Sequence, residues 1–446
     1  MGIQIAVQAI PNFRIKDREE IKKYLTNMIY SIQTVYLGND NEESYLLKEF
    51  GGVIFNNIRL YLGINKDDFI KSISPQDFIT ELMISSQTIL EELCSTGSSG
   101  SLLYYTRDGE FIVKTISKNE FKFLKTMIGE YFFYLKNNPL SFLPKLLGAY
   151  VLKRKYKKNN TNIYFIVMSN VFATNHHIDL RFDLKGSTIG RKVLKGTQDD
   201  NAIFSNGDMA LKDLDFNKSN ERVYIGSKRE VVLNQIKKDI EFLYSINSND
   251  YSLLLGIHCL QEKQNFNLSR LNTLKNTEYN KMDEFSFLSE NTRDFLFTNT
   301  KETESSISSE NSAVDRINKL KEIYDFEDGG ILSKNKNRIY YFGIIDILTQ
   351  FTKKKRLEYW FKKLRYCSED MSCIPPIYYK QRFYNYIQIV FAQECEQTPR
   401  KKENDNSDNK NFYKVDKYGA ISSSNYKEKK NEISEKYTEE ESIQKL

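Results

Sequence analysis

The hydrophobic pattern of the chain predicts a mixture of short strands and longer amphipathic helices. Apolar positions recur at helical spacing in five segments, while strands are predicted by short alternating, β-branched or continuous apolar runs. The predicted helices are Asp17–Tyr36, Glu42–Leu62, Ser117–Leu135, Glu230–Asn247 and Tyr378–Phe391. The predicted strands are 3–9, 102–105, 111–114, 162–168, the apolar run after Asp250 and the apolar run that begins at Ile339.

Two stretches lack this periodicity. Asn, Ser, Thr, Lys and Glu dominate residues 261–337, and residues 393–446 are charged and poor in apolar side chains. Such segments cannot bury enough apolar surface to offset the entropy of ordering the chain. We therefore predict a disordered insertion at 261–337 and a disordered charged tail at 393–446.

Charge and cysteine content exclude several classes of protein. The formal net charge is +6, so local clusters of basic residues matter more than the total. No run of 18 apolar residues could span a membrane, and no signal peptide is evident. Ala6 stands where a myristoylation signal has Ser or Thr, so we expect only peripheral membrane contact. Five cysteines without a Cys-x-x-Cys pair, and three histidines, argue against structural zinc and suit a reducing, cytosolic compartment.

A turn of small residues precedes a hairpin and a helix. Gly97–Ser101 would let backbone N–H groups approach a phosphate, and Lys114 on the returning strand could neutralise its charge. An ordinary hairpin with a surface lysine would have the same pattern, so both interpretations stay open. Ser117 and Glu120 form the sequence signature of a capping box at the start of the helix that follows.

Two aspartates stand next to predicted buried strands. Asp250 comes directly before an apolar run, a position that suits a general base or a substrate-orienting group. A turn aspartate that merely ends the preceding helix is the alternative. Asp346 follows the apolar run that begins at Ile339 and comes shortly before a basic segment, which favours a metal or phosphate site beside an anionic surface.

Two groups of basic residues could face anionic ligands. Lys185 and Arg191 flank a turn rich in hydrogen-bond donors, although a plain polar loop would look similar. Residues 353–365 contain seven basic residues and one acid. Near an anionic leaflet each basic residue contributes about 1 kcal/mol, and aromatic rings settle at headgroup depth. The alternative is a solvated basic helix face. The aromatic residues of this segment are Tyr359, Trp360 and Phe361.

Six motifs follow one another along residues 2–260 and 338–391. They are Ser99–Leu102 with Phe111–Thr115, Leu143–Gly148, Asp183–Thr188, Lys212–Phe216, Asp250–His258 and Gly343–Leu348. In this order and spacing they resemble the phosphatidylinositol phosphate kinase family, and most closely its type I branch, the phosphatidylinositol 4-phosphate 5-kinases. Each motif alone is weak, and the specificity lies in the ordered set.

The resemblance implies an α+β, two-lobed fold of the protein-kinase type, with antiparallel sheets, flanking helices and ATP between the lobes. Residues 1–170 would form the N-terminal lobe, and 171–260 with 338–392 the C-terminal catalytic lobe. The family's motifs assign ATP binding to Gly97, Ser99, Gly100, Ser101, Lys114 and Lys185. They assign catalysis to Asp250 with Lys114 and Asp346, and magnesium to Asp346. Glu120 is a candidate ion-pair partner for Lys114, or only a helix cap.

The resemblance also implies a substrate. The type I branch has a basic pair followed by Leu-Glu, as in Lys355–Glu358, where the 4-kinase branch has Ala in place of the glutamate. We therefore expect phosphorylation of the 5-hydroxyl of phosphatidylinositol 4-phosphate, with phosphatidylinositol 5-phosphate 4-kinase activity as the alternative. The residues expected to face substrate or membrane are Lys185, Arg191, Lys354, Lys355, Arg356, Glu358 and Trp360.

Further expectations concern cofactors, partners and competing functions. ATP and magnesium are the implied cofactors, and an anionic lipid at the cytoplasmic face of the plasma membrane is the implied partner. We expect no nucleic-acid partner, and a homodimer through the N-terminal region is possible within the family pattern. A weakly active lipid-binding scaffold remains an alternative. A protein kinase is disfavoured, because His-Arg-Asp and Asp-Phe-Gly triplets are missing and Leu255 replaces the metal-binding asparagine.

Overall fold

The computed structural model describes most of the predicted ordered segments. The described residues are 14–21, 32–36, 43–73, 101–106, 108–156, 159–194, 210–260, 319–326, 328–352, 355–357, 359 and 374–393. The predicted strand at 3–9, the turn residues 97–100, residues 261–318 of the predicted insertion and residues 394–446 of the predicted tail lie outside them.

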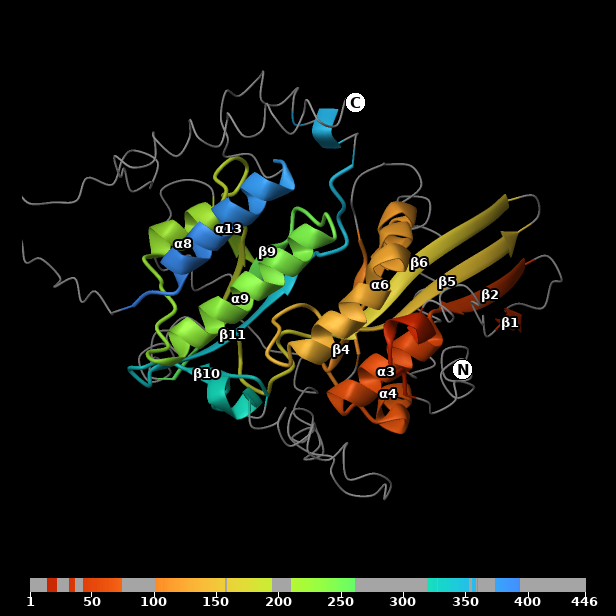
Figure 1. Ribbon diagram of the computed structural model, residues 1–446, viewed down its shortest axis with the longest axis horizontal. Helices are drawn as coiled ribbons and strands as arrows, with labels where there is room; N and C mark the ends of the chain where they lie inside the picture. Colours follow the sequence, from red (N-terminus) through yellow and green to blue (C-terminus); the bar gives the residue numbers. More distant parts are fainter. Residues whose placement is uncertain are drawn as a thin grey trace, which may run out of the picture. The chain divides into compact units, whose positions relative to one another are not determined.

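A six-stranded antiparallel sheet forms the N-terminal half, with strand order β1-β2-β5-β6-β4-β3 (Figure 1). The strand of interest is β4, where Lys114 is partly exposed between buried neighbours. The hairpin predicted at 102–114 is confirmed, with Leu103 paired to Lys114. The bounds are β1 Ile32–Tyr36, β2 Glu43–Phe50, β3 Leu103–Tyr105, β4 Phe111–Ile116, β5 Leu146–Tyr156 and β6 Asn159–Ser169.

Helices cover this sheet. α3 (Gly52–Leu62) and α6 (Lys118–Asn137) pack on it, and α4 (Lys66–Ser72) follows α3. The capping box predicted for α6 is confirmed, because Ser117 Oγ accepts the Glu120 N–H at 3.2 Å and Glu120 accepts the Ser117 N–H at 2.7 Å.

Two helices predicted near the N-terminus are wrong in part. Ile32–Tyr36, placed in the first predicted helix, is strand β1, and Glu43–Phe50, placed in the second, is strand β2. Gly51 has φ 62°, a left-handed conformation that separates β2 from α3. Pairing of β2 with β5 supplies the hydrogen bonds that outweigh the helical spacing of its apolar residues.

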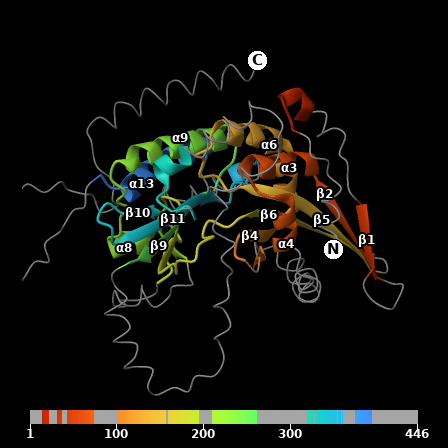
Figure 2. The ribbon, with the colours of Figure 1, turned by 90° about the horizontal axis from the view of Figure 1, so that it is seen from below.

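A five-stranded sheet forms the second half, in the order β10-β11-β9-β7-β8. All pairs are antiparallel except β7 with β8, which are parallel. Figure 2 shows α9 and α6 on the same side of the two sheets. The bounds are β7 Leu180–Leu184, β8 Leu211–Lys212, α8 Asp213–Ser219, α9 Lys228–Ser245, β9 Ser252–Cys259, β10 Ile331–Leu332, β11 Arg338–Ile345 and α13 Pro376–Val390.

The predicted disordered insertion is wrong at its C-terminal end. Residues 319–323 are helical, and β10 pairs with β11. The correction has a simple cause, since Leu320 and Ile323 are three positions apart and both are buried. Because the neighbouring residues are mostly polar, a prediction based on the composition of the segment does not detect this apolar pair.

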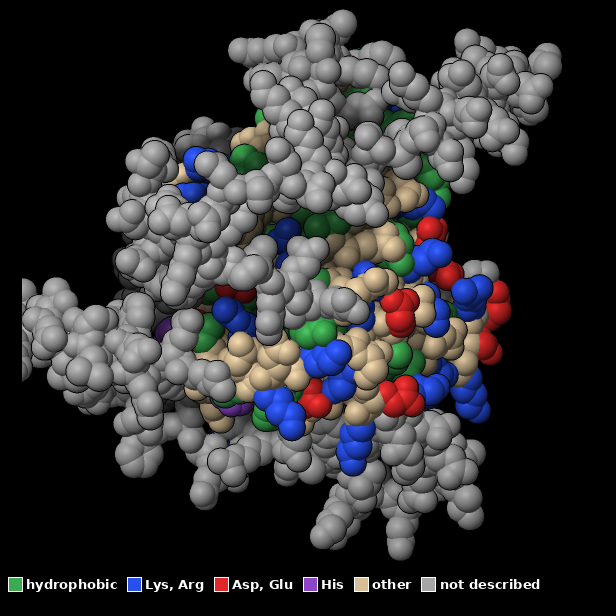
Figure 3. Space-filling view, turned by 90° about the vertical axis from the view of Figure 1, so that its left-hand side faces the viewer, with side chains coloured by type: hydrophobic (Ala, Val, Ile, Leu, Met, Phe, Trp, Pro, Cys, Tyr) green, Lys and Arg blue, Asp and Glu red, His purple; other side chains and the backbone are tan. Residues whose placement is uncertain are grey.

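The arrangement of antiparallel sheets with flanking helices confirms the predicted α+β fold class. Within the described residues, no helix combines the length and apolar character needed to cross a membrane. On the face seen in Figure 3, acidic side chains are interspersed among more numerous basic ones over the described surface.

Candidate active site

Strand pairing brings Asp250 and Asp346 to the same edge of the second sheet. Ser252, at the start of β9, pairs with Ile345, at the end of β11, because the two strands are antiparallel. Asp250 lies two residues before Ser252 and Asp346 one residue after Ile345. Both aspartates have positive φ values, 65° and 63°, so each lies in a tight backbone turn as the chain enters or leaves the sheet.

Hydrogen bonds join the loop before β9 to the loop after β11. The backbone N–H of Asn249 donates to Thr349 O at 2.8 Å, and Ser248 Oγ donates to Ile347 O at 2.7 Å. The Phe351 N–H donates to Asn247 O at 3.1 Å. Ser248 and Asn249 are fully buried, so these bonds are shielded from water. The two aspartates therefore sit on loops whose relative position is fixed.

Lys114 reaches Asp346 from the other sheet. The Lys114 ammonium donates a short hydrogen bond to Asp346 Oδ1. The lysine side chain is 18% exposed and the aspartate side chain 40% exposed, so the carboxylate keeps an open side. The structure thus joins two predicted site residues that are 232 positions apart in the sequence.

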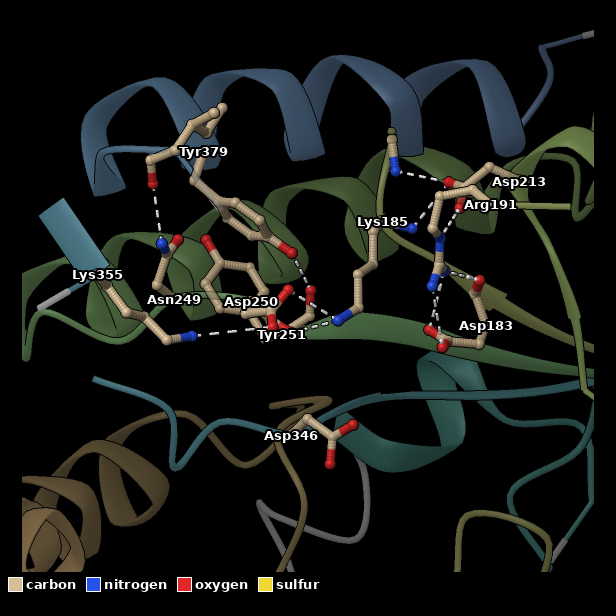
Figure 4. A network of polar contacts seen from close by, with 12 residues as sticks. Asp183, Lys185, Arg191, Asp213, Asn249, Asp250, Tyr251, Asp346, Lys355 and Tyr379 are labelled. Atoms are coloured by element: carbon tan, nitrogen blue, oxygen red, sulfur yellow. Dashed lines mark hydrogen bonds and ion pairs between the residues drawn. The ribbon is translucent and has the colours of Figure 1, made fainter. Parts of the chain in front are cut away.

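Lysines surround Asp250. Lys185, which directly follows β7, donates from Nζ to both Asp250 Oδ1 and Asp250 O, each at 2.9 Å (Figure 4). Lys355 Nζ lies 3.9 Å from the other carboxylate oxygen, Oδ2. Both oxygens of the Asp250 carboxylate therefore face a lysine ammonium group.

Arg191 lies deeper than the sequence interpretation implies. Its side chain is 8% exposed, and Nε donates to Asp213 Oδ2 at 2.6 Å. Its guanidinium also donates to the backbone oxygen of Asp183. Burial disfavours the charged form, but the carboxylates of Asp183 and Asp213 outweigh burial and raise the pKa of Arg191. The predicted contact of Arg191 with a phosphate stays a prediction.

The other predicted site residues lie apart from these contacts or outside the described part of the chain. Ser101 is described and exposed just before β3, and Arg356 is exposed beside Lys355. The Glu120 carboxylate caps α6, and its predicted ion pair with Lys114 stays a prediction. The predicted residues outside the described part of the chain are Gly97, Ser99, Gly100, Lys354, Glu358 and Trp360.

Tyr359 differs from the expectation for the basic segment. Its side chain is only 7% exposed and belongs to the apolar core, so the prediction that it lies at headgroup depth is wrong for this conformation. Leu357, which is 60% exposed, is instead the apolar side chain available on the described part of this segment. A helical turn explains the difference, since side chains two residues apart point to different sides of a helix.

Asn249 and Asp213 are not among the predicted site residues, although both contact the site. Asn249 Nδ2 donates to Ile374 O at 2.8 Å, which ties the start of the final helix to the loop of Asp250. Asp213 accepts the backbone N–H groups of Lys185 and Gly186. The signals that could have indicated them are that Asn249 directly precedes Asp250 and that Asp213 belongs to the Lys212–Phe216 motif.

Comparison with known proteins identifies the family of this chain. Residues 84–390 match the family model described as Phosphatidylinositol-4-phosphate 5-Kinase. A phosphatidylinositol 4-phosphate 5-kinase of Plasmodium falciparum (isolate 3D7) is 30% identical over 410 residues, which cover 87% of this chain and 20% of that protein. Phosphatidylinositol 4-phosphate 5-kinase its3 of Schizosaccharomyces pombe is 29% identical, with 77% of this chain and 46% of that protein covered.

The human phosphatidylinositol 4-phosphate 5-kinase type-1 beta is 28% identical, with 90% of this chain and 70% of that protein covered. This chain thus spans between a fifth and a half of the length of the Plasmodium and Schizosaccharomyces proteins. The family match covers strands β3 to β6 of the first sheet and all of the second sheet, and it includes Lys114, Lys185, Asp250 and Asp346. The chain therefore belongs to the phosphatidylinositol-4-phosphate 5-kinase family.

Proposed function

We propose that this protein is a lipid kinase that transfers the γ-phosphate of ATP to the 5-hydroxyl of phosphatidylinositol 4-phosphate, producing phosphatidylinositol 4,5-bisphosphate. The observation that supports it most is the convergence of Lys114, Asp346, Asp250 and Lys185 from four separate strands and loops. Phosphoryl transfer needs positive charge and in-line positioning more than it needs a covalent partner. These four side chains supply both requirements, and family membership gives the chemistry its context.

Lys114 and Asp346 form the nucleotide side of the proposed site. Magnesium bound with nucleotides takes one or two protein carboxylates and leaves its other positions to phosphate oxygens and water. The open side of the Asp346 carboxylate fits that ligand set. The ion would neutralise charge on the ATP phosphates, and Lys114 would bind a phosphate oxygen beside it. Their ion pair shows that the two side chains can reach one location.

Asp250 and Lys185 form the acceptor side. Asp250 would orient the 5-hydroxyl and accept its proton while the hydroxyl oxygen attacks the γ-phosphorus and ADP leaves with the bridging oxygen. Lys185 holds the carboxylate in one orientation through its bonds to Oδ1 and to the backbone oxygen of Asp250. Lys355, at 3.9 Å from Oδ2, is close enough to meet an anionic headgroup that approaches Asp250.

The proposed contact with the membrane involves the basic segment 353–365. Lys355 is half-buried and Arg356 and Leu357 are exposed next to the site, and Lys354, Glu358 and Trp360 belong to the same segment. We assign to this segment peripheral attachment to the cytoplasmic face of the plasma membrane and the choice of lipid isomer. A homodimer through the N-terminal region remains part of the proposal on family resemblance alone.

A lipid-product assay tests the function. The full chain, with magnesium and radiolabelled ATP, is given vesicles that contain phosphatidylinositol 4-phosphate or its 5-phosphate isomer. We expect label in phosphatidylinositol 4,5-bisphosphate mainly from the 4-phosphate substrate, and a loss of about 10³-fold or more in Asp250→Asn and Asp346→Asn.

The variants also separate the alternatives. A preference for the 5-phosphate isomer would replace the proposed activity with that of a 4-kinase. Vesicle binding without Asp250-dependent transfer would identify a lipid-binding scaffold. Lys237→Gln, which removes an exposed lysine of α9, serves as the control for the loss of one charged residue.

A further inference from the structure

The motif Lys212–Phe216 contains two buried aspartates to which the proposed reaction gives no role. Asp213 and Asp215 are each 1% exposed, and both lie in the first turn of α8. Burial of a carboxylate is costly unless donors surround it, so the partners of these two side chains indicate what each one fixes.

Asp213 is bound to the turn that presents Lys185. Because β7 and β8 are parallel and Asp183 pairs with Lys212, the next residue of the motif lies beside the end of β7. Oδ1 of Asp213 accepts the backbone N–H groups of Lys185 at 2.8 Å and Gly186 at 2.7 Å. Oδ2 accepts Nε of Arg191 at 2.6 Å (Figure 4).

The turn is held from its other side as well. Gly186 has φ 68°, and a Cβ atom there would lie 2.8 Å from Cβ of Tyr386 on α13. The backbone at 185 and 186 is thus confined between the Asp213 carboxylate and α13. From this fixed backbone the Lys185 side chain, 13% exposed, extends to Asp250.

Asp215 provides a comparison within the same motif. Its carboxylate accepts three backbone N–H groups, those of Val193 at 2.9 Å, Leu194 at 3.2 Å and Lys212 at 3.1 Å. It therefore matches Asp213 in burial, element and number of donors. The difference is location, because Asp215 fixes the far end of the loop and has no bond to the backbone of Lys185.

We propose that Asp213 is a positioning residue for phosphoryl transfer, which holds the Lys185–Gly186 turn so that the Lys185 ammonium keeps Asp250 oriented. The inference rests on the proposed function, in which Asp250 acts on the lipid hydroxyl. Arg191 supports the same arrangement, because its guanidinium contacts the carboxylates of both Asp213 and Asp183. If both aspartates only stabilise the fold, substitutions at Asp213 and Asp215 should affect catalysis equally. If Asp213 positions Lys185, its substitution should affect catalysis more.

A double-mutant cycle in the full chain measures this difference. We expect Asp213→Asn to lower kcat about tenfold or more with little change in the KM for ATP, and Asp215→Asn to lower it less than about threefold. In a Lys185→Ala background, Asp213→Asn should lower kcat by no more than about a further twofold, because the ammonium group that Asp213 positions is already absent. Effects of Asp213→Asn that multiply with those of Lys185→Ala would overturn the proposal.

A second measurement does not depend on activity. Lysine labelling with an amine-reactive ester, followed by mass spectrometry, reports how accessible the Lys185 amine is, with exposed Lys237 as internal reference. We expect labelling of Lys185 to rise several-fold in Asp213→Asn and to stay at the wild-type level in Asp215→Asn. Equal labelling in the two variants would contradict the proposal. If Asp213→Asn does not fold, Asp213→Glu, which keeps the charge and displaces the carboxylate, should give the same separation.

The two hypotheses fail in different ways. If the proposed function is wrong, the lipid kinase activity of the wild type will not depend on Asp250, whatever the effect of substitutions at Asp213. If only the positioning role is wrong, activity will depend on Asp250, and Asp213→Asn and Asp215→Asn will lower kcat equally.

Discussion

At the scale of single residues, the candidate site depends on a backbone conformation that Asp and Asn tolerate better than most residues. Asn247, Asp250 and Asp346 all have φ between 59° and 65°. This left-handed region is costly for most L-residues, whereas a short polar side chain can compensate by local hydrogen bonding. The two aspartates thus serve both the turn and the proposed chemistry. Asparagine is the appropriate replacement, because it preserves the turn and removes the charge.

Glu110 gives a prediction of pH dependence. Burial, with the nearby Asp108 carboxylate, raises the pKa of Glu110 from an ordinary 4.5 to about 7. The folded state therefore holds a proton that the unfolded chain has already released, and the contribution of Glu110 to stability falls as pH rises from about 4.5 to 7. We expect Glu110→Gln to lose less stability than the wild type between pH 5 and pH 8, measured by urea unfolding. Asp68→Asn, at an exposed position, controls for the loss of one negative charge. Parallel pH profiles for Glu110→Gln and wild type would contradict this prediction.

At the scale of elements, register and capping set the positions of the site residues. The β9–β11 register places both aspartates at one sheet edge, and a slip by one residue would reverse the faces of the whole strand. Lys114 depends on β4, which packs against α4 through the rings of Phe111 and Phe69, 5.3 Å apart between centroids, and which leads directly into the cap of α6 at Ser117.

The α6 cap gives a prediction of stability. Ser117→Ala removes the acceptor for the Glu120 N–H and should lower the free energy of unfolding by about 1 kcal/mol. Ser227→Ala is the matched control, because Ser227 is the N-cap of α9 and makes no side-chain cap hydrogen bond. The free energies of unfolding of the two variants, measured with denaturant, should differ by about the contribution of one cap hydrogen bond. An equal effect of both substitutions would show that the Ser117 bond contributes nothing measurable.

At the scale of the whole molecule, buried polar contacts join the parts that the reaction must bring together. Asp239 of α9 accepts Tyr134 Oη of α6 at 2.5 Å and the Phe142 N–H at 2.7 Å. Phe142 O in turn accepts the Ile344 N–H of β11 at 2.8 Å. Burial raises the pKa of Asp239, although these donors act against the shift. The ion pair of Lys114 with Asp346 therefore forms between sheets that are already joined through α6, α9 and β11.

The proposed membrane attachment also belongs to the scale of the whole molecule. Leu357 is 60% exposed beside the basic residues of its segment, so Leu357→Ser should weaken binding to anionic vesicles severalfold with little change in thermal midpoint. Ile389→Ser, at a 43% exposed apolar position on α13, is the matched control. Vesicle sedimentation at two salt concentrations measures the effect. Binding of Leu357→Ser that equals that of the control would exclude this segment as the contact.

The sequence by itself determined the parts of this protein that depend on local signals and ordered motifs. The hairpin before α6, the capping box and the core of α9 and α13 follow from turn chemistry and from periodicity over many residues. The motifs also indicated Lys114, Lys185, Asp250 and Asp346 as candidate site residues. Local patterns failed at β1, β2 and residues 319–323, where strand partners or a single apolar pair outweigh the local preference.

Only the tertiary structure decided which of these residues meet. Arg191 and Lys185 are both basic residues in one loop, yet Arg191 is buried against Asp213 and Asp183 while Lys185 reaches Asp250. The parallel pairing of β7 with β8, between residues about 30 positions apart, produces that division. Tyr359 is likewise buried against expectation, whereas Leu357, two positions earlier on the same helical turn, is exposed. Such outcomes depend on long-range packing and register, for which the linear order of residues contains no local signal.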